Sequence, residues 1–351
     1  MKKISLKKII MVLLSIVTGL IFTACAPEKE DDALALGYQA LEEKDYEGAL
    51  QYFSTASENR LDTQDILRGE GIAYMGLADY DKAQESLQTS LQSSDGRIDE
   101  MELDTAFYLA VAEFRNGDPA GSKDTCTAII NLNKENPDAY FLRGKAELSL
   151  DEDDEAVRDF NTAISYKKDD PDLYIDIYEC MMNADLTEDA GIFLKKAMEL
   201  TKINDFQKGK LYYFMGEYDE AKTNLESARG DGSDPELILW LGKTYEALGD
   251  KSYAASLYKT YLSDNPGNVD IYNQLGICEM DTGEYEAALE AFETGLESGE
   301  SEIEQSLLFN QIVAYEYLSD FKKAAVLMEA YLKKYPDDEA AQREYKFLRT
   351  R

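Results

Sequence analysis

Residues 235–266 read PELILWLGKTYEALGDKSYAASLYKTYLSDNP, and the spacing of apolar residues in this stretch indicates how the chain folds. Apolar residues recur with a period of about 3.6 from Leu237 to Tyr245, and again from Ala254 to Tyr261. That period is typical of an amphipathic helix with one buried face. A break at Gly249-Asp250 separates the two runs. The stretch therefore predicts two helices of about 13 residues each, joined by a tight turn.

The same pattern recurs along the chain about every 34 positions. A small residue marks each recurrence at Ala49, Ala83, Ser122, Ala156, Ala190, Ala221, Ala254, Ala288 and Ala324. Twelve residues earlier the chain has Gly37, Gly71, Ala110, Gly144, Gly209, Gly242 and Gly276, with Tyr178 and Ile312 as exceptions. Four residues later it has Phe53, Leu87, Phe160, Leu194, Leu225, Tyr258, Phe292 and Met328, with Cys126 as the exception. A fixed period of this length predicts stacked two-helix units, in which small residues let helix axes approach and large ones fill the seam.

Helix starts and breaks can also be located in the sequence. Asn136-Pro137, Asp170-Pro171 and Asp234-Pro235 each place a capping side chain before a proline at the first helical position. Glycine-containing turns are expected between paired helices at Gly117-Asp118-Pro119, Gly216-Glu217, Gly249-Asp250 and Gly283-Glu284.

These residues resemble the tetratricopeptide repeat, whose signature is a large residue, then Leu-Gly, Tyr, Ala, Phe and Pro at fixed offsets. The clearest match is Ile238, Leu241-Gly242, Tyr245, Ala254, Tyr258 and Pro266, with Tyr258 at the position of Phe. We count nine units, which begin near Glu30, Gln64, Leu103, Pro137, Pro171, Lys202, Pro235, Val269 and Gln305.

The resemblance implies an all-α fold, a right-handed α-solenoid of about nine antiparallel helix pairs over residues 30–336. Residues 337–351 hold no complete unit, but apolar Ala340, Tyr345 and Leu348 alternate with cations and predict a final helix that caps the last repeat. The alternative is a generic helical bundle in which the spacing is accidental.

The first 24 residues have the features of an export signal. Four lysines between Lys2 and Lys8 precede an uncharged run from Ile9 to Ala24, which is short for a membrane-spanning helix. Thr23-Ala24-Cys25 resembles the bacterial lipoprotein processing site, although Phe22 stands where Leu is usual. The resemblance implies a signal peptide over 1–24, an acylated Cys25, a short acidic linker over 25–32 and an extracytoplasmic protein anchored to the cell membrane. An ordinary cleaved signal and an uncleaved anchor are the alternatives.

The composition limits which functions are plausible. The formal net charge is −34, which repels nucleic acid and anionic lipid, and the sequence has no histidine, the commonest general base and metal ligand. No glycine-rich phosphate loop, histidine metal motif or serine elbow is present, so we expect no enzyme, no cofactor, no metal and no catalytic residues. The acidic run Asp151–Glu155 lacks the glycine of a calcium loop, which favours a solvated turn.

Three cysteines besides Cys25 fall at apolar or semi-apolar positions of different predicted helices: Cys126, Cys180 and Cys278. We expect small buried side chains rather than a disulfide framework.

The tetratricopeptide resemblance also implies a groove, lined by the first helix of each repeat, in which a protein or peptide binds. Transferring the groove positions gives the candidates Phe107, Phe114, Arg115, Phe141, Lys145, Phe206, Lys210, Tyr213, Phe214 and Lys243, with Tyr38, Arg68, Phe309 and Tyr317 toward the ends. Aromatic residues beside cations suit an extended or helical peptide with some acidic character. We therefore expect a membrane-anchored interaction scaffold or adaptor of the bacterial cell envelope, of open oligomeric state. A cell-wall-active or divalent-cation-binding module that uses surface carboxylates is the alternative.

Overall fold

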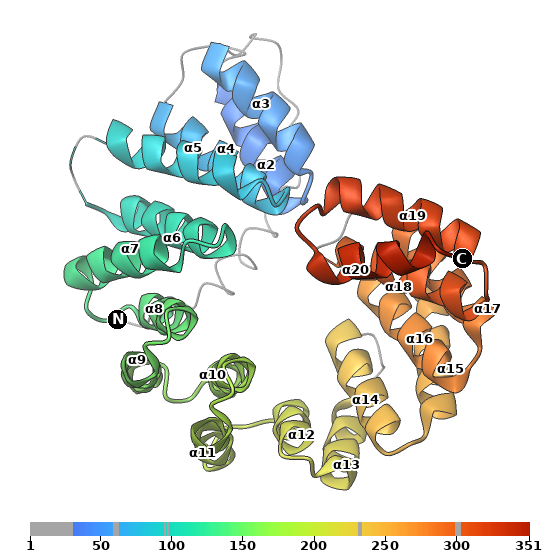
Figure 1. Cartoon of the computed structure of the whole chain (residues 1–351). Helices are drawn as coiled ribbons and strands as arrows, with labels where there is room; N and C mark the ends of the chain where they lie inside the picture. Colours follow the sequence, from blue (N-terminus) through green and yellow to red (C-terminus); the bar gives the residue numbers. More distant parts are fainter. Residues whose placement is uncertain (1–30, 59–62, 95, 97, 231–233, 299–302) are drawn as a thin grey trace, which may run out of the picture. The chain divides into compact units, whose positions relative to one another are not determined.

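The computed structural model describes residues 31–58, 63–94, 96, 98–230, 234–298 and 303–351. Within these ranges it consists of 19 helices and contains no strand (Figure 1). The predicted signal peptide, Cys25 and the linker up to residue 30 lie outside the described residues. The first helix begins at Asp31, so the last two residues of the predicted linker already belong to it.

The chain divides into two compact units, Met1–Leu132 and Asn133–Arg351. The first contains α2 (Asp31–Glu42), α3 (Tyr46–Glu58), α4 (Thr63–Gly76), α5 (Tyr80–Ser93), α6 (Glu100–Arg115) and α7 (Pro119–Leu132). The second begins with α8 (Pro137–Ser149), α9 (Asp153–Tyr166), α10 (Pro171–Asn183), α11 (Thr187–Met198), α12 (Asp205–Phe214) and α13 (Tyr218–Ala228). It continues with α14 (Pro235–Ala247), α15 (Lys251–Asp264), α16 (Val269–Thr282), α17 (Tyr285–Glu297), α18 (Glu304–Tyr317), α19 (Phe321–Lys334) and α20 (Glu339–Leu348).

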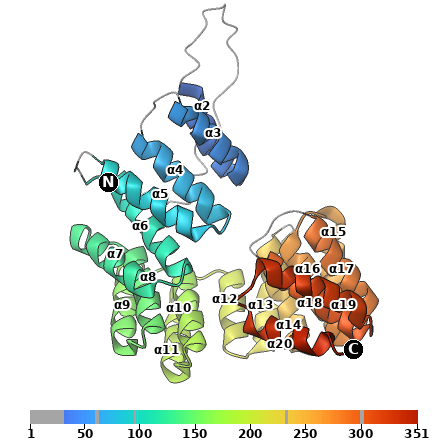
Figure 2. The same cartoon turned by 45° about the horizontal axis from the view of Figure 1, so that its top comes forward.

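The helices from α2 to α19 form nine consecutive pairs in the described part of the chain, which confirms the predicted fold class and the nine units. Figure 2 shows such pairs side by side, for example α8 with α9 and α10 with α11. Two first helices begin about three residues away from their predicted starts, because capping boxes fix them. Asp99 and Glu102 set the start of α6, and Asn204 and Gln207 set the start of α12.

The periodic glycines lie where the two helices of a pair approach most closely. A Cβ atom on Gly37 would lie 2.5 Å from the ring of Phe53, and one on Gly144 would lie 2.6 Å from the ring of Phe160. Gly71 faces Leu87 and Gly209 faces Leu225 in the same way, each at 2.5 Å. Each glycine thus contacts the large residue 16 positions later in its own repeat. The predicted close approach is confirmed, and the residue that fills the seam is identified.

Each turn within a pair contains one residue in the left-handed region of backbone conformation, seven positions after the place in the first helix where seven of the nine pairs have a small residue. Four of these are the predicted glycines, Gly117, Gly216, Gly249 and Gly283. The other five are Lys44, Ala78, Asp151, Asp185 and Ser319, with φ between 55° and 63°. The turn geometry is therefore set by the packing of the pair, and glycine is used at some turns only.

The predicted proline starts are also observed. The side chain of Asn136 accepts a hydrogen bond from the Ala139 amide at 3.0 Å, and that of Asp234 accepts one from the Glu236 amide at 2.9 Å. Asp170 occupies the capping position of α10, but no side-chain capping bond is formed there.

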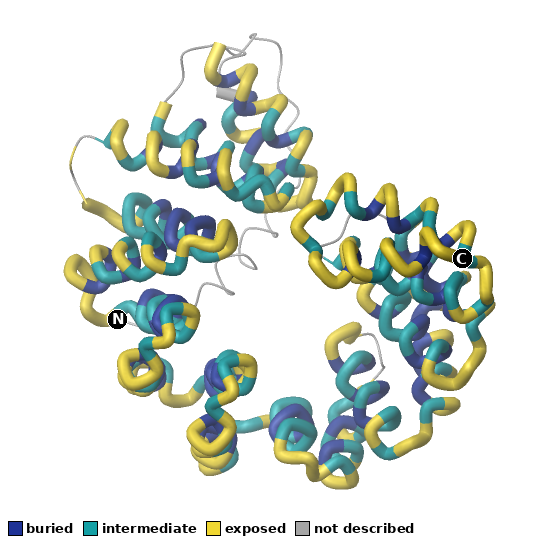
Figure 3. The backbone as a smooth tube through the Cα atoms, viewed as in Figure 1, coloured by how far each residue is buried: buried dark blue, intermediate teal, exposed yellow. Residues whose placement is uncertain are grey.

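Buried residues run along the facing sides of the paired helices, while the outward sides are exposed (Figure 3). In the second unit one apolar cluster spans α9 to α12 and another spans α13 to α17. After the last pair, α20 packs Ala341 and Leu348 against Met328 and Tyr331 of α19. None of the described helices is long and apolar enough to span a bilayer.

Candidate functional site

Five of the ten predicted groove residues lie on the neighbouring first helices α12 and α14 of the second unit. With additional residues from α10 and α14, four of them form a group that we call the aromatic–lysine cluster. The cluster consists of Tyr178, Lys210, Tyr213, Phe214, Trp240 and Lys243. Except for the buried Lys210, these side chains are half-buried, so their rings pack on the protein and still reach its surface.

The aromatic rings pack edge to face around Trp240. Its ring centroid lies 5.2 Å from that of Tyr213 and 5.1 Å from that of Phe214. Tyr178 approaches Phe214 at 5.4 Å from the other side, and its hydroxyl donates a hydrogen bond to the Phe214 carbonyl oxygen at 3.3 Å. Each edge-to-face contact favours one relative orientation of its two rings. Because the contacts share rings, they hold the whole group in place.

Tyr178 stands where most repeats have glycine, and this exception has a structural use. In six other first helices a glycine at this position leaves room for the large residue of the partner helix. The tyrosine ring instead packs toward α12 and joins two successive repeats through its contact with Phe214. Burial raises the pKa of Tyr178, so the hydroxyl remains a protonated donor at neutral pH.

The two lysines of the cluster have different environments. The Nζ of Lys243 lies 4.8 Å from the Trp240 ring centroid, a cation–π contact, and no ion pair within the described residues involves it. Lys210 is buried and pairs with Asp172 at 3.1 Å and with Glu236 at 2.9 Å. Burial alone would lower the pKa of Lys210, but the two carboxylates raise it above the ordinary value. Lys243 is therefore available to a ligand, whereas the charge of Lys210 is already neutralised.

Three more predicted residues of the second unit lie beside aromatic rings. Phe206 lies beneath Lys210, whose Nζ is 5.5 Å from the ring centroid. Phe141 packs on the fully buried Phe160 at 5.9 Å, and the Nζ of Lys145 lies 5.6 Å from the Phe141 ring. Phe141 and Phe214 both pack against the apolar core of α9 to α12, so truncating either side chain also removes core contacts.

The remaining predicted residues lie elsewhere. Phe107, Phe114 and Arg115 belong to α6 in the first unit, where the two phenylalanines are half-buried and Arg115 is exposed. Also in that unit, Arg68 of α4 forms an ion pair with Asp104 and lies between the rings of Tyr38 and Tyr108.

Near the other end, Phe309 packs on Tyr331 at 5.9 Å and Tyr317 on Tyr285 at 4.9 Å. These rings stabilise the local packing of the last repeats.

Sequence reasoning missed Trp240 and Tyr178. Trp240 is the only tryptophan in the sequence and precedes Lys243 by three residues, which places both on one face of α14. That spacing was a usable signal, but the transferred family positions nearest to Trp240 are Leu239 and Lys243, so Trp240 itself was not selected. Tyr178 was recognised only as a break in the glycine pattern.

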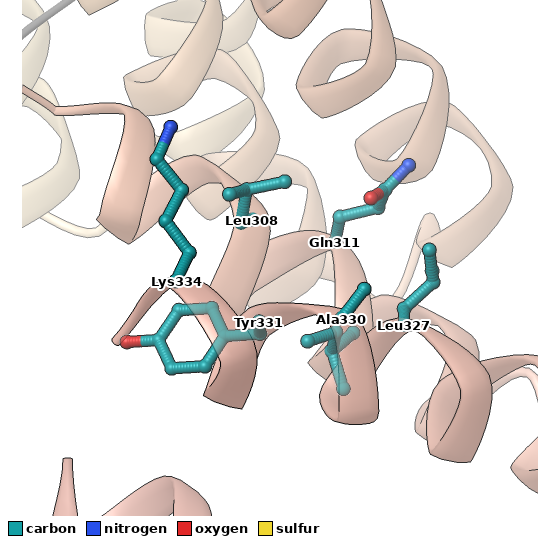
Figure 4. Close-up of a pocket in the computed structure, with 7 residues that line it drawn as sticks. Leu308, Gln311, Leu327, Ala330, Tyr331 and Lys334 are labelled. Atoms are coloured by element: carbon teal, nitrogen blue, oxygen red, sulfur yellow. The ribbon is translucent and has the colours of Figure 1, made fainter. Parts of the chain in front are cut away.

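A pocket of about 210 Å³ lies between α18 and α19 (Figure 4). Leu308, Ile312, Leu327 and Ala330 give it an apolar lining. Its polar groups are already engaged within the protein: the Tyr331 hydroxyl donates to Asp338 at 2.6 Å, and Lys334 pairs with Glu304. The third polar residue of the lining, Gln311, donates from Nε2 to a Glu293 carboxylate oxygen at 3.3 Å.

Metal-binding and nucleophilic groups have little support in the described ranges. No group of three or more His, Cys, Asp or Glu side chains there could hold a metal ion. Cys126, Cys180 and Cys278 form no disulfide in the described part of the chain, and Cys126 and Cys278 are buried. Burial raises the pKa of the Cys180 thiol and of the Cys278 thiol to about 11, so both are protonated at neutral pH.

The fold and the cluster define a helical-repeat protein, in which tandem helix pairs present a row of side chains on successive first helices. Models of the tetratricopeptide repeat match residues 137–170, 206–266, 252–308 and 306–338. The chain therefore contains tetratricopeptide repeats, as the sequence pattern predicts. All four matched segments lie in the second unit, and one of them, 206–266, includes residues of the cluster.

The chain is also similar to individual proteins. A BBSome complex member, bbs-4 of Caenorhabditis elegans, is 27% identical over 205 residues, which cover 55% of this chain and 44% of that protein. The chain thus matches less than half the length of this curated relative.

Among solved structures, a tetratricopeptide repeat protein from Parabacteroides merdae has a TM-score of 0.48 at 14% identity and covers 72% of this chain and 98% of that one. A MamA structure has a TM-score of 0.40 at 23% identity, with 47% and 93% covered. Pseudomonas aeruginosa pilF has a TM-score of 0.39 at 14% identity, with 71% and 96% covered.

Proposed function

We propose that this protein is a non-enzymatic scaffold of the bacterial cell envelope, which binds a partner protein through the aromatic–lysine cluster and is held at the membrane by a lipid on Cys25. Tetratricopeptide repeats are protein-interaction units, so a protein ligand is the general expectation for this chain. The cluster is the single observation that carries the specific proposal.

The cluster has the composition of a binding hot spot. Tryptophan, tyrosine and cations beside aromatic rings are the groups that dominate binding energy at protein interfaces. Here Trp240, Tyr213 and Phe214 are held rigid by one another, so a ligand costs little side-chain entropy on binding. Lys243 adds a positive charge in a strongly acidic chain. We infer that the ligand is a polypeptide segment with an apolar anchor and an acidic residue next to it.

The capture test replaces Lys243 by a photoreactive amino acid in intact cells and identifies the crosslinked protein by mass spectrometry. Lys195 on α11 is exposed and serves as the control position. A partner captured from position 243 and absent at 195 supports the proposal. Lys243→Glu should abolish its co-purification while Lys195→Glu, the same charge change, should leave it intact. Equal capture by both charge variants contradicts the assignment of the cluster.

Substituting Lys243 avoids a difficulty with the phenylalanines. The sequence pattern suggests Phe141→Ala with Phe214→Ala as the test pair, expected to abolish capture without lowering helicity. Because both rings pack on the core, we now expect the pair also to destabilise the second unit. Lys243 has no comparable packing role, since its contact is with the Trp240 ring.

The anchoring part of the proposal has its own test. It is supported by the basic, apolar and small-residue order of the first 25 residues. Cys25→Ser should remove metabolic palmitate label and release the protein from the membrane fraction, since acyl chains provide the attachment. A protein that remains in the membrane fraction without label would contradict lipid anchoring, whatever the outcome of the capture test.

A further inference from the structure

The first helix pair of the first unit and the last helices of the second unit differ in the sign of their charge. Residues 33–58 of the first pair contain five acidic residues and one basic residue. Residues 321–351, the end of the chain, contain eight basic and five acidic residues, although the formal net charge of the whole protein is −34. The positive sign at one end is therefore a local reversal and not a trend of the composition.

The first helix has a face that no described helix covers. α2 packs on α3 and α4 through residues such as Ala33 and Ala40. Along the opposite side its exposed residues Ala35, Leu36, Gln39 and Glu42 follow helical spacing, and the exposed Glu43 comes directly after the helix. Leu36 is 39% exposed, so its apolar side chain reaches the surface on this side. The face thus combines an apolar residue with two carboxylates.

The last helix has the matching kind of face. α20 buries Ala341 and Leu348 against α19 and exposes Arg343, Lys346 and Phe347 on its outer side. Phe347 is 41% exposed, and the guanidinium carbon of Arg351 lies 4.6 Å from its ring centroid. Throughout the described residues no ion pair involves Lys346, Arg349 or Arg351. The face thus combines an exposed ring with three cations that form no ion pair in the described ranges, whereas Arg343 pairs with Glu339 at 3.6 Å.

Terminal repeats of a stacked array lack a neighbour on one side, so their outer faces are the natural places for further packing. We propose that the outer face of α20 binds the outer face of α2 of a second copy of this chain. The contact is heterologous, because two different surfaces meet, and it leaves one free end of each kind on the pair. Repetition of the contact builds chains of copies.

The charges on the two faces favour a second copy of this chain over a partner that offers apolar surface alone. At physiological ionic strength the screening length is about 8 Å, so the overall like charge of two copies is screened while adjacent charges still attract. Glu42 and Glu43 supply carboxylates to the unpaired cations, and Leu36 and Phe347 supply apolar area. Each surface ion pair contributes little alone, so several pairs and the apolar contact are needed together.

The experiment uses full-length chains that each carry one additional cysteine, either Gln39→Cys on α2 or Ala340→Cys on α20; both positions are exposed. The chains are mixed in mild detergent and treated with a short bis-maleimide. We expect a crosslinked dimer in the mixture and none above background with either variant alone. Crosslinks of one variant with itself would indicate a symmetric dimer and overturn the proposal. A third chain carries both additional cysteines. If a crosslink forms only within this chain and not between chains, the proposal is also overturned.

Charge reversal tests the chemistry of the contact. Lys346→Glu with Arg349→Glu in the Ala340→Cys chain should abolish the crosslink to Gln39→Cys. Adding Glu42→Lys and Glu43→Lys to the Gln39→Cys chain should restore it, which a merely unfolded variant could not do. Lys195→Glu with Lys196→Glu on α11 is the matched control and should have no effect. A crosslink that survives the first reversal contradicts the proposal.

Discussion

At the scale of the residue, some turns have a side chain at a left-handed position where glycine would have less backbone strain. Ala78 has φ of 55° in the turn between α4 and α5, and Gly249 has φ of 85° at the equivalent turn between α14 and α15. A left-handed conformation costs a residue with a Cβ about 1–2 kcal/mol, while glycine loses about 0.5–1 kcal/mol more entropy on folding. The two effects oppose each other, and the first is the larger.

We therefore expect Ala78→Gly to stabilise the protein by up to about 1 kcal/mol. The reverse change, Gly249→Ala, should destabilise the protein by a similar amount, because alanine is strained in the left-handed conformation. No atom lies within 4 Å of the added Cβ, so no contact offsets this strain. Urea denaturation followed by circular dichroism measures both. If Ala78→Gly destabilises and Gly249→Ala stabilises, the strain assigned to these turns is wrong.

At the scale of the element, the two helices of a pair leave little room at Gly242 of α14, where an added Cβ would lie 2.2 Å from the Tyr258 ring of α15. Tyr258 is fully buried, and its hydroxyl donates to Glu246 at 2.7 Å, so the ring has no room to move away. Gly242→Ala should cost about 1–3 kcal/mol through overpacking. Gly191→Ala in α11, where no atom lies near the added Cβ, should instead stabilise by about 0.5–1 kcal/mol. Similar effects of the two changes on the denaturation midpoint would contradict this account.

The contact between the last pair and α20 should depend on pH. Burial, and then the carboxylate of Glu344 on α20, raise the pKa of Glu316 on α18 to about 7. Its ordinary pKa is 4.5, so the folded protein binds the proton more tightly than the unfolded chain does. The contribution of Glu316 to the attachment of α20 should thus be largest below about pH 4.5. It should weaken as the pH rises to about 7 and then stay constant.

Hydrogen exchange of α20 amides, corrected for the intrinsic rate, measures this dependence. Glu316→Gln should remove most of the loss of protection between pH 5 and pH 7. Glu339 is an exposed residue of α20, and Glu339→Gln should leave this loss of protection unchanged. Persistence of the full pH dependence in Glu316→Gln would show that other groups cause it.

At the scale of the whole molecule, the excess of acidic residues is the dominant electrostatic feature. A formal net charge of −34 produces self-repulsion in the compact state, which salt screens. We expect the thermal midpoint to rise when sodium chloride is added. Glycerol at matched osmolality is the uncharged control and should not reproduce this rise. A midpoint that falls steadily with salt would mean that the ion pairs outweigh the repulsion.

The sequence determined the helices, their pairing and the turns, because these depend on neighbours within one repeat. The contact of Gly242 with Tyr258 joins residues only 16 positions apart and recurs at the same spacing in Gly37 with Phe53. Such short, repeated spacings are visible in the letters themselves.

Only the tertiary structure decided which side chains remain available for binding. Sequence spacing treats Lys210 and Lys243 as equivalent, but Lys210 is neutralised by Glu236 and Asp172, which are 26 and 38 positions away on two other helices. The position of Trp240 among rings from α12 likewise depends on how successive repeats pack. The physical reason is that contacts between repeats are set by helix crossing geometry, and no periodicity within one repeat contains that information.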